Sequence, residues 1–339
     1  MTQSITSLIE KLEKMPILQW KVLVPIQNLV LKVPSLEIGR VHLTIFEKAE
    51  QEEALTAVQK INDTSTSPEP VKEGAMQMVT DLVSKTYLHR TVATANVDAV
   101  DENQALALAE EETEHALNVL RFYGVLGNNT RMRKAFIGPE GTIFRGRYIT
   151  LCLAGDMFVL PWRITGYLFE FEIDASALAL MDKLSFQRLR EISKKSHEER
   201  TDFERLLVTA IDFYGRAINE PNPRNAYVTF LISLESLLLK EGEPRSLLAE
   251  RVALVVGKDA ETRTALFEQT RAAYKLRSDI IHHGFDDVTE DDVWRVSAIG
   301  FQVIVRLIPM SVHLNDIGQL ITMCTKSKFG GPPFGEASG

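Results

Sequence analysis

The sequence predicts an α+β protein: an N-terminal domain of mixed helices and strands, followed by an all-helical C-terminal bundle. The chain has 339 residues, about twice the usual length of a domain, so two domains are expected. Short β-branched stretches occur up to about residue 175, whereas apolar residues recur at helical spacing from about residue 176 onward. We therefore expect an N-terminal domain at 1–175, a bundle at 176–325 and a disordered, aperiodic tail at 326–339.

The N-terminal domain is predicted from a few strongly patterned segments. Residues 5–12 have apolar side chains at helical spacing, which indicates a docked amphipathic helix. Segments 41–46 and 87–97 alternate and contain β-branched residues, which is typical of strands, and 142–173 contains two or three more. Asp101 is a favourable N-cap for a helix that continues to about residue 120. Residues 62–74 have the composition of a loop.

Six helices are expected in the C-terminal domain, over about 184–192, 203–214, 226–240, 247–256, 264–283 and 291–309. Pro221 stops the second helix, and Gly257 and Gly284 follow the ends of the fourth and fifth, as glycine does at C-caps. The sixth begins at a capping signal over 289–292. Short connections between long helices indicate a compact bundle.

Composition favours a cytoplasmic protein. The N-terminus lacks the basic start and apolar core of a signal peptide, and no apolar run approaches the roughly 18 residues of a membrane span. Cys152 and Cys324 stand alone, without the Cys-x-x-Cys or Cys/His spacing of a zinc site, which favours a reducing compartment. We therefore expect no membrane segment and no bound metal.

The charge of the chain limits how it could bind nucleic acid. The formal net charge is −8. Residues 1–175 hold 17 Lys and Arg against 23 Asp and Glu, and residues 176–339 hold 21 against 23. Neither half is basic, so any RNA binding must be local and depend on shape rather than on charge alone.

Several common enzyme motifs are absent. The sequence has no Gly-x4-Gly-Lys-[Ser/Thr] phosphate loop and no Gly-x-Gly-x-x-Gly dinucleotide fingerprint. It also lacks His-Glu-x-x-His and Gly-x-Ser-x-Gly, which mark zinc proteases and serine hydrolases. Because these motifs are absent, far fewer classes of enzyme remain as candidates for the protein.

The segment from Arg277 to His282 is the strongest candidate for chemistry, and it can be interpreted in two ways. Helices favour cationic residues in the last turn and glycine after it, because both suit the C-terminal end. On this interpretation Ile280 packs inward, while Arg277 and His282 lie in solvent and have no catalytic role.

The catalytic interpretation rests on what RNA cleavage needs. A histidine can transfer protons near neutral pH, and a guanidinium can stabilise the charge that builds on phosphate oxygens. The RNA supplies its own 2′-hydroxyl nucleophile, so no metal or other cofactor is expected. Five helical residues leave Arg277 and His282 roughly 140° apart around the axis, so two copies across a two-fold axis could complete one site.

Residues 198–310 resemble the HEPN superfamily, specifically its ApeA-like branch in prokaryotic defence proteins. The resemblance is carried by three segments: Leu-Ile-Ser-Leu-Glu-Ser-Leu-Leu at 231–238, Leu-Ala-Glu-Arg-Val-Ala at 248–253, and Tyr-x-x-Arg-Ser-Asp-Ile-Ile-His at 274–282, followed by His-Gly. The last segment fits the family's Arg-x4–6-His signature, and it lies late in the predicted bundle, as the signature does in the family.

The resemblance implies a dimeric bundle with metal-independent endoribonuclease activity against tRNA or messenger RNA. Arg277 would stabilise the transition state, and His282 would act as general acid or base. His283 also falls within the allowed spacing, so the choice between the two histidines stays open. Four supporting positions are implied: Glu235 and Tyr274, which pack or orient, and the flanking residues Ser278 and Asp279.

A basic segment around a predicted turn is a second candidate. Its cations could hold RNA backbone, or they could form an ordinary solvated loop. They are Arg131, Arg133, Lys134, Arg145 and Arg147.

We therefore expect an N-terminal domain that senses or presents a target and restrains or triggers the nuclease. It is joined to a helical domain that cuts RNA as a homodimer. A role in antiviral defence would bring a defence-system partner or a phage-derived trigger. The alternative is a non-catalytic RNA-binding or scaffold protein, in which the Arg–His segment is only a helix terminus.

Overall fold

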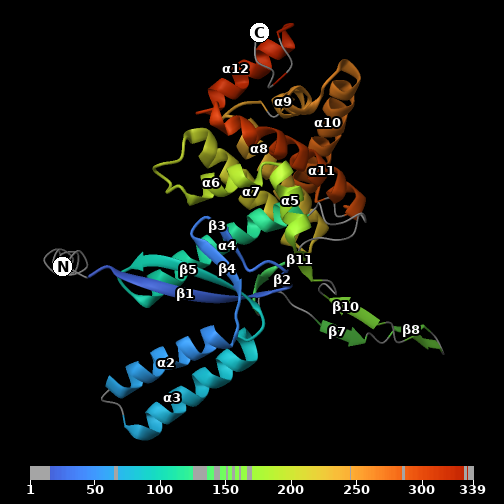
Figure 1. Ribbon diagram of the computed structural model, residues 1–339. Coiled ribbons are helices and arrows are strands. Elements are labelled where there is room, and N and C mark those ends of the chain that lie inside the picture. Colours follow the sequence, from blue (N-terminus) through green and yellow to red (C-terminus); the bar gives the residue numbers. More distant parts are fainter. Residues whose placement is uncertain are drawn as a thin grey trace, which may run out of the picture. The chain divides into compact units, whose positions relative to one another are not determined.

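The computed structural model describes residues 16–64, 68–124, 136–140, 146–149, 152–154, 157–159, 162–165, 170–244, 246–284, 287–331 and 334. The described chain is α+β, as predicted, with an antiparallel sheet toward the N-terminus and helices toward the C-terminus (Figure 1). It forms two compact units. Unit 1 comprises residues 1–114 and 138–172, and unit 2 comprises 115–137 and 173–339.

One boundary between the units falls inside helix α4 (Glu102–Tyr123), after Glu114. Another falls at residues 172–173, close to the expected position 175. The second half of α4 belongs to unit 2 because its side chains pack there. Asn118 lies so close to Gly215 that a Cβ on the glycine would approach the Asn118 Cα to 2.5 Å. The predicted N-cap is confirmed, since the Asp101 carboxylate accepts a hydrogen bond from the Gln104 backbone N–H at 2.8 Å.

Unit 1 is built on a five-stranded antiparallel sheet in the order β3-β4-β5-β1-β6. The strands are β1 (Leu18–Gln27), β3 (Ser35–Ile38), β4 (Val41–Ile45), β5 (Thr91–Ala99) and β6 (Gly138–Pro139). In β3 and β4 buried and exposed side chains alternate, which leaves one face of that edge in solvent. The central strand β5 is buried on both faces over most of its length. The two strands expected over 41–46 and 87–97 are thus present, the second starting at Thr91.

A helical hairpin connects β4 to β5, which are neighbouring strands of the sheet. Helices α2 (Lys48–Thr64) and α3 (Glu69–Leu82) lie side by side, and one π-helical turn, η1 (Val83–Tyr87), leads back into β5 (Figure 1). The hairpin meets the sheet through a small core of Phe46, Val83 and Val92. The loop expected over 62–74 is wrong for most of its length, because α2 reaches Thr64 and α3 begins after Pro68, which suits a helix start.

The remaining strands of unit 1 form short ladders. Strand β2 (Leu29–Leu31) pairs with β11 (Phe171–Ile173). Two-stranded pairs join β7 (Gly146–Ile149) to β10 (Trp162–Thr165), and β8 (Cys152–Ala154) to β9 (Met157–Val159). The expected strands within 142–173 are therefore present in shorter pieces.

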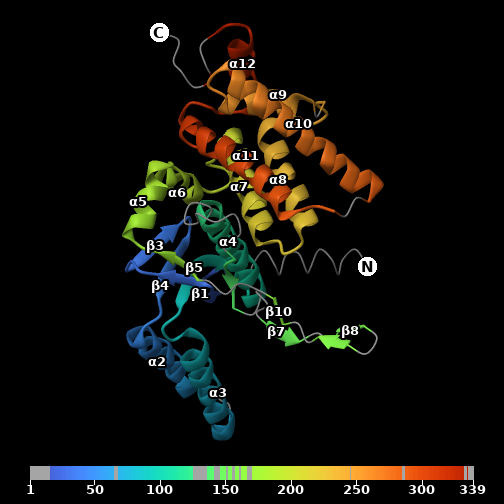
Figure 2. The ribbon, with the colours of Figure 1, turned by 90° about the vertical axis from the view of Figure 1, so that its right-hand side faces the viewer.

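Unit 2 is a helical bundle (Figure 2). Its helices are α5 (Ala175–Lys183), α6 (Phe186–Lys194), α7 (Asp202–Asn219), α8 (Pro223–Leu238), α9 (Ser246–Val256), α10 (Ala260–His283), α11 (Glu290–Leu307) and α12 (Ile317–Lys328), with a single turn η3 (Pro309–Val312). The closest packing is between α7 and α8, α9 and α10, and α8 and α11. The predicted compact bundle is thus present, with α5 and α12 in addition.

An aromatic cluster fills the centre of the bundle. The Tyr214 ring meets Phe122 edge-on at 5.1 Å and Phe230 at 4.8 Å between centroids. Its hydroxyl, which has no access to water, donates a hydrogen bond to the Ser297 carbonyl oxygen at 3.0 Å. The side chains of α4, α7, α8 and α11 therefore share one core.

Capping residues explain where most of these helices begin. Thr201, Asp259 and Thr289 each accept a hydrogen bond from the third helical N–H and form reciprocal capping boxes. Helix α10 therefore starts at Ala260, four residues before the expected position. Gly284 ends it with φ 65°, the left-handed conformation predicted for a C-cap glycine.

Helix α12 was not expected from the sequence. Asp316 caps it at 3.0 Å from the Gln319 backbone N–H, and it continues to Lys328. Residues 326–328, assigned to the disordered tail, are thus helical. Phe334 is also buried, and its carbonyl oxygen accepts a hydrogen bond from Arg306 Nη2 at 2.8 Å.

One described segment, Glu290–Val312, is long and apolar enough to cross a membrane by length and composition. Half of its most apolar stretch is buried inside the unit, where α11 packs on α8, α9 and α7. A central bundle helix has the same composition as a span, so this segment is weak evidence for one.

Candidate active site

The end of α10 brings together three of the residues predicted for the site. Arg277 is buried with a side-chain exposure of 9%, and it lies between Glu235 of α8 and Tyr274 of its own helix. We refer to Arg277, Glu235 and Tyr274 as the Arg277 cluster. The interpretation that placed Arg277 in solvent is wrong, because α10 turns this side chain toward α8.

The contacts of the Arg277 cluster are specific. Arg277 Nη1 donates a hydrogen bond to the Tyr274 hydroxyl at 3.2 Å, and the guanidinium carbon lies 5.4 Å from the centre of the Tyr274 ring. Arg277 Nε is 3.4 Å from Glu235 Oε1, an ion-pair distance. The Glu235 side chain is 19% exposed, so the pair is mostly shielded from water.

The hydrogen-bonding capacity of the cluster is not used up. Within the described residues, neither Arg277 Nε nor Glu235 Oε1 has a hydrogen-bond partner, although both atoms are buried. Unsatisfied buried polar atoms are rare in folded proteins because each costs about 1–3 kcal/mol. The two atoms face each other at the ion-pair distance of 3.4 Å, so the two charges compensate one another inside the bundle.

The two histidines lie elsewhere on the helix. His282 and His283 are both exposed in the last turn of α10. No hydrogen bond joins Arg277 to either of them within the described residues. One copy of the chain thus presents a buried guanidinium and exposed imidazoles on different sides of the same helix end, as expected for residues roughly 140° apart.

The two flanking residues support the helix end. Ser278 and Asp279 are half-buried, and the Asp279 carbonyl oxygen accepts the Gly284 backbone N–H that closes α10. Arg224 of α8 donates a hydrogen bond to the Ile280 carbonyl oxygen at 3.2 Å. These bonds fix the last turn, which carries the histidines, against α8.

Two large apolar side chains are exposed at this end of unit 2. Ile281, beside the histidines, is 47% exposed, and Trp294 in the first turns of α11 is 40% exposed. Aromatic and aliphatic side chains of this size are typical anchors in interfaces between proteins. The end of α10 that carries the candidate residues therefore also presents apolar surface.

Most of the predicted basic segment falls outside the part of the chain that the structure describes. Arg131, Arg133, Lys134 and Arg145 lie outside the described residues. Arg147 is in β7, where its backbone pairs with Ile164 of β10. Its candidate role in holding RNA remains a prediction.

A second polar constellation, which sequence reasoning missed, joins α4, α6 and α7. His115 Nδ1 lies 2.8 Å from Asp212 Oδ1, and His115 Nε2 lies 3.0 Å from Ser193 Oγ. We call these three residues the His115 relay. They are 78 and 97 residues apart, so no local motif could reveal them. Their connectivity is that of a Ser-His-Asp triad.

Access and surroundings argue against a nucleophilic role for Ser193. The residue is only 2% exposed and lies inside helix α6, where its carbonyl oxygen also accepts a hydrogen bond from Arg200 Nη2 at 3.2 Å. A catalytic serine needs an approach path and N–H donors for an oxyanion. The His115 relay therefore ties three helices together by satisfying buried polar groups.

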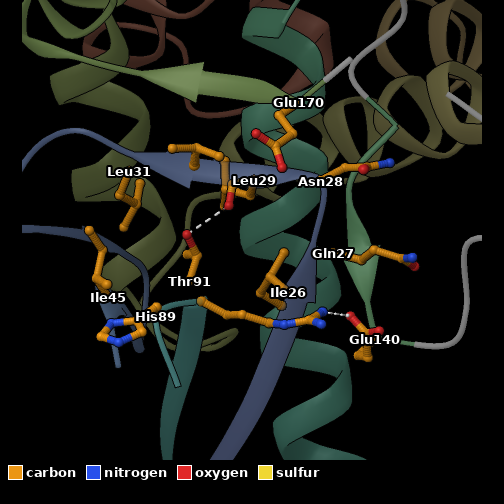
Figure 3. Close-up of a pocket in the computed structure, with 12 residues that line it drawn as sticks. Ile26, Gln27, Asn28, Leu29, Leu31, Ile45, His89, Thr91, Glu140 and Glu170 are labelled. Carbon is orange, nitrogen blue, oxygen red and sulfur yellow. Dashed lines mark hydrogen bonds and ion pairs between the residues drawn. The ribbon is translucent and has the colours of Figure 1, made fainter. Parts of the chain in front are cut away.

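Unit 1 contains a polar pocket of about 440 Å³ at the junction of β1 and β2 (Figure 3). Asn28 and His89, on its wall, have left-handed backbones with φ 68° and 61°. The Arg90–Glu140 ion pair, at 2.7 Å, closes one side, and Glu170 lies on another (Figure 3). Left-handed non-glycine residues often gather at functional sites, but the mixed lining indicates no particular ligand.

No family of known proteins helps to assign these sites. The chain matches no protein-family model, and no curated protein or solved structure is significantly similar to it. Among the described residues, no three His, Cys, Asp or Glu side chains are grouped closely enough to hold a metal ion. The function must be argued from the residues themselves.

Proposed function

We propose that this protein is a metal-independent endoribonuclease of the HEPN type, which acts in antiviral defence or as a toxin. It cleaves RNA by attack of the 2′-hydroxyl on the adjacent phosphate. Arg277 and His282, or His283 in its place, carry the reaction at a site formed by two copies of the chain. The residues of the family resemblance at 231–238, 248–253 and 274–284 support the assignment.

The observation that carries the proposal is the buried Arg277 cluster beside two exposed histidines. Glu235 and Tyr274 contact the Arg277 guanidinium next to a helix end that carries His282 and His283. A phosphate oxygen is the acceptor that a guanidinium N–H pairs with best. Glu235 and Tyr274 hold the guanidinium in one orientation, so little side-chain entropy is lost when it binds.

The reaction assigns one role to each group. A histidine removes the 2′-hydroxyl proton, and the 2′-oxygen forms a bond to phosphorus. The bond from phosphorus to the 5′-oxygen breaks, and that oxygen takes a proton from a histidine acting as acid. Arg277 stabilises the charge on the phosphate oxygens. The products are a 2′,3′-cyclic phosphate and a 5′-hydroxyl end.

A second copy is needed because one helix end does not place the groups together. Arg277 is buried against Glu235, whereas His282 is exposed on another side of α10. In a two-fold dimer, the histidines of one copy reach the Arg277 cluster of the other. Exposed Ile281 and Trp294 supply apolar surface for such an interface.

The alternative is a non-catalytic RNA-binding or scaffold protein. The Arg277–Glu235 ion pair favours it, because an arginine paired inside the bundle has a structural use without any substrate. On this alternative the exposed histidines only stabilise the C-terminal end of α10. The two proposals differ in whether the histidines matter for any reaction.

The discriminating experiment is cleavage of labelled tRNA and messenger RNA in EDTA. Wild type, Arg277→Ala, His282→Ala and His283→Ala are compared, with the matched control Arg271→Ala, an exposed arginine on the same helix. We expect cleavage to survive EDTA and to fall about 10²-fold or more in Arg277→Ala and in one histidine variant. The product ends are checked for 2′,3′-cyclic phosphate.

Two results would contradict the enzyme. Wild type that leaves RNA intact, with and without lysate from infected cells as a source of trigger, favours the scaffold. Cleavage that persists in both histidine variants points to a contaminating nuclease. Circular dichroism of each variant shows whether lost activity reflects lost folding.

The wider role follows from the same proposal. We place the protein in the cytoplasm, where its RNA targets are. A nuclease active against cellular RNA harms its host, so unit 1 is proposed to restrain unit 2 until a phage-derived trigger or a defence partner releases it.

A further inference from the structure

A second pocket, within unit 2, has a composition unlike the rest of the acidic chain. It has a volume of about 620 Å³, which falls in the range of small-molecule sites. It lies where the α5–α6 junction, the end of α9 and the second half of α11 meet, and Phe334 also lines it. We call it the basic pocket.

Three cations surround the basic pocket, and no carboxylate lines it among the described residues. Lys183, Lys258 and Arg306 are all exposed. None of them has an ion pair within the part of the chain that the structure describes, and Arg306 has its hydrogen bond to the Phe334 carbonyl. Three positive charges that line one concave surface without a lining carboxylate favour an anion there.

Two acids, Asp182 and Asp259, are adjacent in sequence to these cations, but neither lines the pocket. Asp259 follows Lys258, and its carboxylate is occupied as the N-cap of α10, accepting the Thr262 backbone N–H at 2.8 Å. The positive side chains therefore remain available to a ligand.

The backbone adds to the positive potential. Helix α6 has nine residues, and its N-cap residue, Ser185, lines the pocket. The Ser185 side chain makes no capping hydrogen bond, and its backbone is left-handed with φ 67°. An uncapped helix N-terminus favours an anion, and a strained residue at that point is common where a site is preorganised.

The floor of the basic pocket is apolar. Val255 and Phe334 are buried, and the half-buried Phe301 ring is backed by Phe122, with 5.0 Å between ring centroids. Phe122 is fully buried, so the wall that Phe301 forms is packed against the core of the unit. A ligand that uses the whole pocket needs an apolar body as well as a charge.

We propose that the basic pocket binds a small phosphate ester in which the phosphate is attached to an apolar or aromatic body. The phosphate lies among Lys183, Lys258 and the start of α6, and the body packs on Phe301 and Val305. Helix α10 separates this pocket from the Arg277 cluster, since Ala260 and Arg277 are about 25 Å apart along the axis. The site is therefore independent of the proposed nuclease site.

Isothermal titration of the full chain, without RNA, tests the proposal. Octyl phosphate represents an aliphatic body, adenosine monophosphate an aromatic one, and inorganic phosphate has neither. We expect one of the two esters to bind more tightly than inorganic phosphate and to bind at least fivefold more weakly in Lys183→Ala and Lys258→Ala. The control Lys275→Ala removes an exposed lysine from the middle of α10 and should leave affinity unchanged.

The outcomes are distinct. The ester that binds identifies the body that the pocket accepts. The proposal is overturned if neither ester binds better than inorganic phosphate, or if Lys275→Ala weakens binding as much as the pocket variants. A further variant, Val305→Asp, places a carboxylate on the half-buried wall and should abolish ester binding in folded protein, as judged by circular dichroism.

Discussion

Arg251 and Glu243 form a two-point ion pair, with Nη1 2.6 Å from Oε2 and Nη2 2.7 Å from Oε1. The Arg251 side chain is only 5% exposed, and Nη1 also donates to the Leu238 carbonyl oxygen. The pair anchors the turn after α8 to helix α9. The hydrogen bonds from Arg251 lower the pKa of Glu243 from 4.5 to about 2.

This pair makes the stability of unit 2 depend on pH. Because the folded pKa is depressed, the contribution of Glu243 is fully present above about pH 4.5 and is lost as pH falls toward 2. Glu243→Gln should cost about 2 kcal/mol of unfolding free energy at pH 7 and little at pH 2. Urea unfolding at both pH values measures this, and a difference that does not shrink in acid would contradict it.

Variants of the Arg277–Glu235 pair should show that the stability of the protein and its activity on RNA can change independently. Glu235→Gln leaves the Arg277 guanidinium buried without its anion, which should cost about 2–4 kcal/mol. The double variant Glu235→Leu with Arg277→Met replaces the pair by apolar side chains and should recover most of that loss. If the proposed function is correct, this double variant does not cleave RNA even though it is stable. A stable, fully active double variant would rule out a role for Arg277 in cleavage.

The His115 relay should prove structural. His115→Ala removes the group between Asp212 and Ser193 and should lower the unfolding free energy by about 1–3 kcal/mol. Ser193→Ala should cost about 1 kcal/mol. A fluorophosphonate probe, which labels activated serines, should not react with the native protein. Labelling of wild type that disappears in Ser193→Ala would make the relay a catalytic triad.

The crossing of α4 and α7 depends on Gly215. An alanine there would bring its Cβ within 2.5–2.6 Å of Asn118 atoms, so the helices must separate. We expect Gly215→Ala to lower stability by about 1–3 kcal/mol. Gly74→Ala is the matched control, since nothing lies within 4 Å of its Cβ position in α3, and it should raise stability by about 0.5–1 kcal/mol. Thermal denaturation of the two variants checks both signs.

The Cys324 thiol should be inert in the native protein. Cys324 is buried in α12, and burial raises the pKa of its thiol to about 12, so almost no thiolate exists at pH 8. In a Cys152→Ser background, Ellman's reagent should react only after unfolding. Fast reaction in native buffer would mean that α12 opens readily.

Local chemistry explains which parts of the fold could be predicted. Strand β4 and the C-terminal end of α10 follow from alternation and a capping residue, which act within a few positions of the chain. No helix was expected where α2, α3, α5 and α12 lie. In α3 no side chain is buried, and in α5 only Met181 is, so these two helices lack the broad apolar stripe that indicates a helix in a sequence.

The candidate site could be predicted only in part. Tyr274 and Glu235 were predicted to pack or orient because they lie at motif positions. Their contacts with Arg277 and its burial were not predicted, since a helix-end arginine usually reaches solvent. The His115 relay and the basic pocket depend on side chains from distant helices. Such assemblies leave no periodicity in the sequence, and only the folded bundle reveals them.

The exposure of Trp294 gives unit 2 an optical reporter. It is the one tryptophan in the sequence of that unit, and at 40% exposure its indole is in contact with water. If two copies meet at this end of α10 and α11, the indole moves into a drier environment. Its emission should then shift to shorter wavelength as protein concentration rises, so that assembly can be followed without any label.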